Sequence, residues 1–403
     1  MHGAFSDLLT IFLLMTGSLV MPFLAGYVRV PSAVLLIGYG LAVGPHALGL
    51  LGDNQVVAFL YEFGFIVLMF LAGMEIDFNG IRSRGPRSIA VFAVICATVF
   101  GLAFLTAYVL DLHPVFGLAL GATSVGLPLA ILKETGKLRT PLGQGIIILG
   151  SVGEFITVVG MTLFYFADRY GLSWQLLAGL GKLAGMLAVA GITLRTLMAV
   201  AWWKPARFQW LVDERAGSEI GVRAALFVMM GFSLLALLAG LESIVGAFVA
   251  GALIAFVLRG KEVLEEKLTV VGYGLFIPIF FIEVGMRFDP GVISGQGLLH
   301  ACALLLAILV VRLLPCLALL RQGYSLRYMF ATVSLLSTPL TLVVAIATIG
   351  LELGALDKNG HGVLIILAVM SGLVFPVLFR LLKTNGDPTD SAAEPTGKSA
   401  VTK

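Results

Sequence analysis

Charged residues are scarce in this chain, and cysteines are rare. Of its 403 residues, 12% are Asp, Glu, Lys or Arg, about half the share of a soluble globular domain, whereas 59% are hydrophobic. The mean hydropathy is +1.03. Only three cysteines are present, which excludes a disulfide-rich scaffold. So little charge over this length excludes a soluble domain and indicates an integral membrane protein.

The motifs of several enzyme classes are also missing. The chain has no glycine-rich phosphate loop, no zinc-ligand spacing and no nucleophile elbow. Cys96, Cys302 and Cys316 fall within apolar runs, so we expect packing residues rather than a metal or disulfide set. The net charge of +3 gives no nucleic-acid surface. We therefore expect no catalytic residues, no cofactor and no nucleic-acid partner, and hence a protein that is not an enzyme.

Apolar segments of about 20 residues recur along the whole chain, each long enough to cross a hydrocarbon core of about 30 Å as a helix. Since backbone polar groups must be satisfied within lipid, the expected fold class is an all-α polytopic membrane protein. Thirteen predicted spans cover about residues 7–28, 32–51, 56–77, 88–110, 114–132, 141–167, 172–203, 217–239, 241–258, 266–286, 293–320, 326–351 and 361–384.

The charges of the connecting loops alternate across this set of spans. Nearly all loop Lys and Arg fall in one alternating set of loops, and the other set holds only Arg169, Arg287 and Lys358. Because positive loops stay in the cytoplasm, we expect a multi-pass plasma-membrane protein, in a bacterium an inner-membrane one, with its N-terminus outside and its C-terminus in the cytoplasm. Residues 385–403 are polar and predict a disordered cytoplasmic tail after a transmembrane domain over 1–384.

Glu154 is the charge that most needs an explanation. It stands in "GSVGEFITVV" and is the only charged residue between Pro141 and Ala167. Burying a lone carboxylate in apolar surroundings costs several kcal/mol or forces it to take up a proton. An acid at this depth of a membrane is functional by default, so Glu154 is the expected ion- and proton-binding residue.

Two predicted spans carry a proline and small polar residues at their centres. These are "PVFGLALGATSVGLPLAIL" at 114–132 and "YMFATVSLLSTPLTLVVAIATIGL" from Tyr328 on. Proline removes a backbone donor and clashes one turn back, so both helices are expected to open there; a packed kink is the alternative. The residues at the two breaks are Thr123, Ser124, Ser337, Thr338 and Pro339.

The positions of these two spans favour an inverted repeat. They lie seven spans apart and so cross the membrane in opposite directions, and thirteen spans divide into two sets of six around a linker. In such repeats two interrupted helices meet near the bilayer midplane and form an ion site. At about 1.5 Å per residue, both breaks and Glu154 lie near the centres of their spans. Ser151, one turn before Glu154, is a further candidate ligand.

Other ionisable residues lie nearer the ends of spans. Arg312, in "LLLAILVVRLLPCLALL", either snorkels to the headgroups or is a counter-charge to a carboxylate or to broken-helix carbonyls. Glu242 and Glu283 lie toward the outer ends of their spans and are candidates for an outer vestibule. Glu75, at the inner end of its span, is expected to be solvated or paired, as single acids near an interface usually are.

Five pieces of sequence carry a family resemblance. In order they are "VPSAVLLIGYGLAVGPHALGLL", "EFGFIVLMFLAGMEIDF", "GATSVGLPLAILKETG", "LESIVGAFVAGALIA" and "IPIFFIEVGMRFD". Over about residues 10–384 the chain resembles monovalent cation:proton antiporters of the Kef-like, second cation:proton antiporter group of the Na+/H+ exchanger superfamily. The resemblance implies an NhaA-like homodimer in the lipid bilayer. Its core, about 88–167 and 293–384, would carry two crossing broken helices and slide against a scaffold formed by the remaining helices.

The resemblance also assigns roles to single positions. The family's essential carboxylate falls at Glu154, its buried basic residue at Arg312 and its Thr/Ser break at Thr123 and Ser124. Where relatives have a polar or acidic residue before the carboxylate, this chain has Gly153.

A buried carboxylate binds either a proton or a cation, and this competition is the basis of exchange. Oxygen ligands from Thr123, Ser124, Ser151, Ser337 and Thr338 would complete a site for a hard monovalent cation, Na+ or K+, at Glu154. Since no second acid adjoins Glu154 in the sequence, we expect an electroneutral one-for-one antiporter working by alternating access. Two alternatives remain: an ion-coupled organic-anion transporter that uses Arg312, and a non-transporting sensor or scaffold, suggested by Gly153.

Overall fold

The structure, a computed structural model, describes residues 2–28, 30–52, 55–76, 78, 86–138, 140–170, 220–239, 241–257, 262–288, 295–321 and 324–382, and scattered positions between 181 and 196. All regular elements among these residues are helical. They are α1 (His2–Val28), α2 (Ser32–Val43), α3 (Gln55–Met74), α5 (Pro86–Val109), α6 (Pro114–Gly121), α7 (Gly126–Glu134), α8 (Pro141–Tyr170), α11 (Ile220–Leu238), α12 (Ser243–Val257), α13 (Glu262–Val271), the π-helix η2 (Gly272–Phe276), α14 (Ile277–Arg287), α15 (Gly295–Arg321), α16 (Leu326–Leu336), α17 (Leu340–Glu352) and α18 (Lys358–Leu381).

The apolar runs form the helices that their length predicts. Among the described residues, 10 helical stretches are long and apolar enough to cross a membrane, and two shorter apolar helices, Ser32–Val43 and Ser243–Val257, accompany them. Together these match every predicted span except 172–203, most of which lies outside the described residues, as does the tail at 385–403. The all-α polytopic fold is confirmed, whereas the total of thirteen spans stays a prediction.

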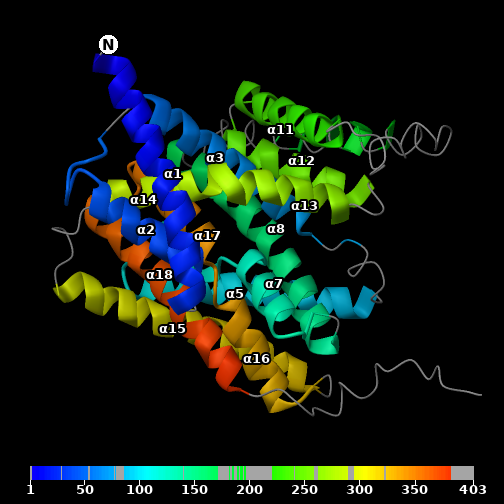
Figure 1. Ribbon diagram of the computed structural model, residues 1–403. Helices are drawn as coiled ribbons and strands as arrows, with labels where there is room; N and C mark the ends of the chain where they lie inside the picture. The colour runs from blue at the N-terminus through cyan, green and yellow to red at the C-terminus, as the bar shows by residue number, and fades with distance from the viewer. Residues whose placement is uncertain are drawn as a thin grey trace, which may run out of the picture.

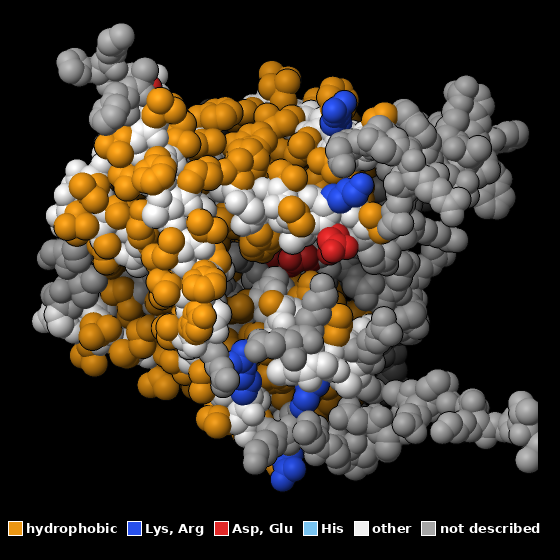
Figure 2. All heavy atoms as spheres, viewed as in Figure 1, with side chains coloured by type: hydrophobic (Ala, Val, Ile, Leu, Met, Phe, Trp, Pro, Cys, Tyr) orange, Lys and Arg blue, Asp and Glu red, His pale blue; other side chains and the backbone are white. Residues whose placement is uncertain are grey.

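Large apolar side chains cover much of the outer surface. Figure 2 shows them spread over most of one face, and the Lys and Arg side chains of the described residues appear there in a few places. Phe12 on α1, Tyr108 on α5 and Phe227 on α11 are 67%, 82% and 79% exposed. A water-facing surface would not carry apolar patches of this extent, so these helices present their apolar sides to lipid.

The closest helix packing falls into two sets (Figure 1). The first set contains α1, α2, α3, α11, α12, α13, η2 and α14, and the second contains α5, α6, α7, α8, α15, α16, α17 and α18. Within the first set α3 and α12 lie so close that a Cβ at Gly73 or Gly251 would overlap a carbonyl oxygen of the other helix. Small residues permit this close approach. The van der Waals contacts that result stabilise the helix pair in lipid, where no hydrophobic effect drives helices together.

Both interruptions expected from the sequence are present in the second set. One apolar span is divided into α6 and α7 by residues 122–125, and another into α16 and α17 by residues 337–339. Pro128 lies in the first turn of α7, where its missing N–H leaves no hydrogen bond unmade, and Pro339 is the N-cap of α17. Each break therefore starts a new helix inside the membrane and exposes backbone groups there.

Candidate functional site

The carboxylate of Glu154 lies at the first break. Glu154 is on α8 and is 1% exposed. Its Oε1 accepts a hydrogen bond from Ser124 Oγ at 3.3 Å, and its Oε2 accepts one from Val125 N at 3.3 Å. Val125 N is free to donate because α6 ends before it and α7 starts after it. Glu154 therefore caps the positive end of α7, where a negative charge is favoured.

The two interrupted helices meet at the same place. Ser124 Oγ, which contacts Glu154, lies 3.0 Å from the hydroxyl oxygen of Thr341, near the start of α17. A single polar chain thus runs from the acid through the first break to the second. Thr341 was visible in the sequence as part of the second polar cluster but was not selected as a site residue; its position two residues after Pro339 was the available signal.

Two buried hydroxyls near the breaks have no hydrogen-bond partner among the described residues. These are Ser151 Oγ on α8, in a residue 1% exposed, and Ser337 Oγ in the second break, in a residue 0% exposed. Thr338 differs, because its hydroxyl donates to Leu335 O at 2.6 Å. Since buried polar atoms are almost always satisfied, Ser151 and Ser337 are two hydroxyls whose oxygens remain available to bind a ligand.

Gly153 packs directly against the side chain of Thr123. A Cβ on Gly153 would lie 2.8 Å from Thr123 Cβ and 3.0 Å from its Oγ1. Thr123 is held there by its own N–H, which donates to Thr157 Oγ1 at 3.1 Å, while the Thr157 hydroxyl donates to Gly153 O at 2.7 Å. The side chain of Thr123 thus occupies the space that a larger residue at position 153 would need. Thr157 was missed by sequence reasoning, although it lies one turn beyond Gly153.

Arg312 holds the carbonyl end of α6. The residue is on α15 and 1% exposed, so it does not snorkel. Its Nη1 donates to Leu120 O at 2.7 Å and to Ile308 O at 3.3 Å, and its Nη2 donates to Ala122 O. Among the described residues no ion pair joins it to a carboxylate. Of the readings that the sequence left open, the geometry matches a counter-charge to broken-helix carbonyls, where the helix dipole favours a cation.

A second acid approaches the break from the other helix set. Glu75 follows α3, and its two carboxylate oxygens lie 3.4 and 3.5 Å from the point where a Cβ of Gly126 would be. Its charge is close enough to that of Glu154 for the two to interact, and Tyr273 of η2 interacts with both. The sequence shows no second acid next to Glu154, but the fold brings one near, because α3 ends where α7 begins.

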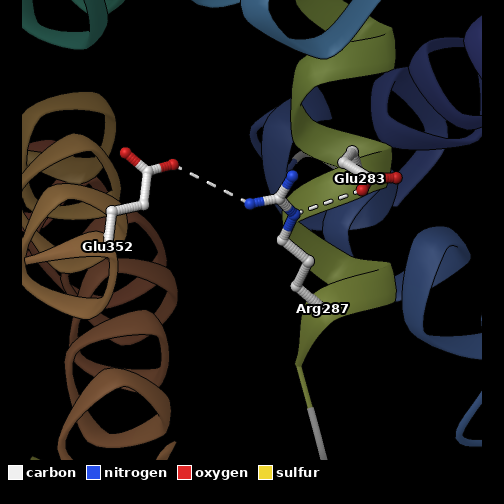
Figure 3. A network of polar contacts seen from close by, with 3 residues as sticks. All are labelled: Glu283, Arg287 and Glu352. Atoms are coloured by element: carbon white, nitrogen blue, oxygen red, sulfur yellow. Dashed lines mark hydrogen bonds and ion pairs between the residues drawn. The ribbon is translucent and has the colours of Figure 1, made fainter. Parts of the chain in front are cut away.

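The candidates at the predicted outer end form a different kind of cluster. Glu283, 5% exposed, accepts a hydrogen bond from Arg287 Nε at 3.2 Å, and Arg287 Nη1 lies 3.9 Å from Glu352 Oε1 on α17 (Figure 3). The guanidinium also lies 4.4 Å from the centre of the Tyr61 ring. Glu242 is half-buried and its charge interacts with that of Glu352. Glu283 and Glu352 therefore share one arginine that joins the two helix sets, and a role of these acids and Glu242 in a vestibule stays a prediction.

Two of the membrane-crossing helices are interrupted, and their breaks meet beside one buried carboxylate. This architecture is that of polytopic membrane proteins built like secondary transporters. The chain belongs to the family described as "Sodium/hydrogen exchanger, transmembrane", whose sequence profile matches residues 12–382. This membership confirms the resemblance seen in the sequence.

Individual relatives support the same family. The chain is 31% identical over 376 residues to "Putative Na(+)/H(+) antiporter YjbQ" of Bacillus subtilis (strain 168), covering 88% of this chain and 59% of that relative. It is 25% identical over 360 residues to "Na(+)/H(+)-K(+) antiporter GerN" of Bacillus cereus, covering 87% of this chain and 89% of the relative. The structure of the sodium proton antiporter MjNhaP1 from Methanocaldococcus jannaschii at pH 8 has a TM-score of 0.61 at 16% identity, covering 94% and 97% of the two chains. That likeness shows a common fold.

Proposed function

We propose that the protein is a secondary antiporter that exchanges a monovalent cation, Na+ or K+, for protons at Glu154. The observation that carries the proposal is the placement of one fully buried carboxylate on the hydroxyl and amide of a helix break that also contacts a second break. The names of the relatives, which describe Na+/H+ and Na+/H+-K+ antiporters, support the same substrates.

The exchange follows from what the carboxylate can bind. A proton on Glu154 neutralises it in a medium that penalises charge, and a cation does the same by ligation, so the two exclude one another. The hydroxyls of Ser151 and Ser337, which lack partners in the described part of the chain, and that of Ser124 are the oxygen ligands that suit a hard cation. Arg312 donates its hydrogen bonds to backbone carbonyls, so the carboxylate of Glu154 remains available for a proton or a cation.

We propose further that the second helix set is the moving core and the first set the scaffold. This division corresponds to the predicted core at about 88–167 and 293–384, and it is supported by the packing, which is closest within each set. Alternating access would expose Glu154 to one side at a time. Assembly as a homodimer, an inner-membrane location with a cytoplasmic C-terminus and an electroneutral one-for-one cycle belong to the same proposal.

The experiment is a dye-based measurement of proton movement in everted vesicles after addition of Na+, K+ or Li+. Wild type is expected to dissipate the proton gradient with Na+ or K+, and Glu154→Gln is expected to fail at equal expression. Glu266→Gln, a change to an exposed acid on α13, is the matched control and should resemble wild type. Absence of cation-dependent proton movement in well-folded wild type, over a broad pH range, contradicts the proposal.

Stoichiometry needs a separate measurement. In proteoliposomes whose voltage is clamped with K+ and valinomycin, Na+-driven proton movement is expected to be independent of the imposed voltage. An exchange that generates current overturns the one-for-one cycle and leaves the exchange itself standing.

A further inference from the structure

The guanidinium of Arg312 has one nitrogen that its carbonyl contacts do not use. An arginine presents five N–H donors in a planar fork. Nη1 donates to Leu120 O and Ile308 O, and Nη2 donates to Ala122 O. Nε has no hydrogen-bond partner among the described residues, although the residue is 1% exposed. A buried donor on a charged group is costly to leave unpaired, so a partner of another kind is expected at Nε.

Arg312 lines a small cavity beside the first break. The cavity offers about 20 Å³ to the centre of a water molecule. Thr123 from the break, Cys96 from α5 and Cys316 from α15 also line it, and all of these side chains are buried. The remaining walls are apolar, among them Val99 of α5. The cavity therefore lies between two helices and the break and contains the guanidinium together with a hydroxyl and two thiols.

The size and the walls of this cavity suit a single water molecule. A cavity needs about 10–15 Å³ by this measure to hold a water, and the water needs two to four polar partners. Arg312 Nε is a donor to it. Thr123 Oγ1 is an acceptor from it, because the hydroxyl proton of Thr123 is directed to Gly121 O at 3.4 Å. The thiols of Cys96 and Cys316 are weaker partners on the other walls.

We propose that one water molecule is bound in this cavity and bridges Arg312 Nε to the hydroxyl of Thr123. Arg312 then supports the break twice, directly through the backbone carbonyls at the end of α6 and through the water to a side chain of the break. Thr123 in turn packs against Gly153, the neighbour of Glu154. The water is a ligand of the fold and not the exchanged ion, so its presence does not depend on the proposed function.

The direct test is an experimental map of the purified full-length protein at a resolution that shows ordered waters. Wild type is expected to show a peak about 2.7–3.2 Å from both Arg312 Nε and Thr123 Oγ1. Val99→Ile, which adds a methyl group to the cavity wall, is expected to lack that peak. An empty cavity in wild type overturns the proposal. So does a peak that gains the anomalous signal of bromide after chloride is replaced, because the ligand is then a small anion.

The sign of a stability change gives an independent test. Filling a dry apolar cavity stabilises a protein, whereas displacing a water that pairs a buried charged donor destabilises it. Val99→Ile is therefore expected to lower the melting temperature in detergent by about 2–4 °C. Val310→Ile, at a 53% exposed position of α15, is the matched control and should leave it unchanged. A melting temperature of Val99→Ile equal to or above that of wild type overturns the proposal.

A double variant separates loss of the water from simple overpacking. Thr123→Val keeps the shape of the side chain but removes the hydroxyl that accepts from the water. Because Thr123→Val and Val99→Ile act on the same water, their combined loss in melting temperature should be smaller than the sum of the single losses. Thr123→Val combined with Val310→Ile should be additive. Full additivity of the first pair overturns the proposal. If Val99→Ile does not fold, Cys96→Val adds apolar volume on the same wall and carries the same expectations.

Discussion

The centre of the molecule and the end that the sequence predicts to be the outer one contain the same kinds of charge in opposite arrangements. At the outer end Arg287 is shared by two carboxylates, Glu283 and Glu352 (Figure 3). At the centre Arg312 donates to the carbonyls of a broken helix, and Glu154 accepts from a hydroxyl and an amide. The protein therefore compensates the two carboxylates around Arg287, whereas in the described part of the chain no cationic side chain pairs with Glu154.

The largest effect is expected for Glu154 itself. Glu154→Gln keeps the size of the side chain but removes the buried negative charge that accepts the hydrogen bonds of Ser124 and Val125 at the break, so exchange should be lost. Glu283→Gln is the comparison at the outer end and should retain exchange, since it alters an acid already held by Arg287. Proton efflux in everted vesicles measures both. An equal loss of exchange in Glu154→Gln and Glu283→Gln would contradict the proposed difference between the two regions.

The second-largest effect is expected for Arg312, because its loss leaves backbone carbonyls in a low-dielectric interior without their hydrogen-bond donor. Arg312→Gln leaves Leu120 O and Ala122 O without a cationic donor, which should cost about 3 kcal/mol of stability and also impair transport. Thermal unfolding of the purified protein in detergent measures the stability. Arg312→Lys, which keeps the charge, should recover part of it. Unchanged stability in the Gln variant would mean that the carbonyls are satisfied in another way.

Gly153→Ala tests how closely the centre is packed. The new Cβ would lie 2.8 Å from Thr123 Cβ, so the break must shift, at a cost of about 1–3 kcal/mol and with reduced exchange. Gly231→Ala on α11 is the control, since nothing lies within 4 Å of its added Cβ. Combining Gly153→Ala with Thr123→Gly should relieve the overlap. If Gly153→Ala is as stable as Gly231→Ala, Thr123 can move away from the added Cβ at no measurable cost in free energy.

The smallest effect is expected for the outer ion pair. Arg287 and Glu352 have side chains 37% and 52% exposed, and exposed pairs contribute about 0–1 kcal/mol. Glu352→Gln should therefore change thermal unfolding little and leave the KM for the cation unchanged. A drop in stability like that of Arg312→Gln would show that the outer cluster is as tightly held as the centre.

The fold could be predicted from the sequence because lipid imposes a strict rule on length and polarity. Each described span corresponds to an apolar run, and both breaks were marked by Pro128 and Pro339 with small polar neighbours. The span at 172–203, the orientation and the dimer remain predictions. A lone acid in an apolar run is conspicuous, so Glu154 could be selected from the sequence, and Ser124 with its break. The structure brings the two into contact, and their role in ion binding stays a prediction.

The rest of the site depends on contacts between helices, which no local pattern records. The partners of Arg312 are backbone carbonyls of α6, and a carbonyl has no sequence signature. Thr157 and Thr341 are residues of a type common wherever membrane helices approach closely, so their roles could not be separated from packing. Glu75 was read as an acid at the end of a span, and only the folded arrangement places it beside Gly126.

The central claim is that a cation and a proton compete for the carboxylate of Glu154. The most direct test is to count protons released when Na+ or K+ is added to the purified protein in a weakly buffered solution. Wild type is expected to release close to one proton per cation bound, and Glu154→Gln is expected to release none. Cation binding without proton release, or equal release from the Gln variant, would contradict the claim.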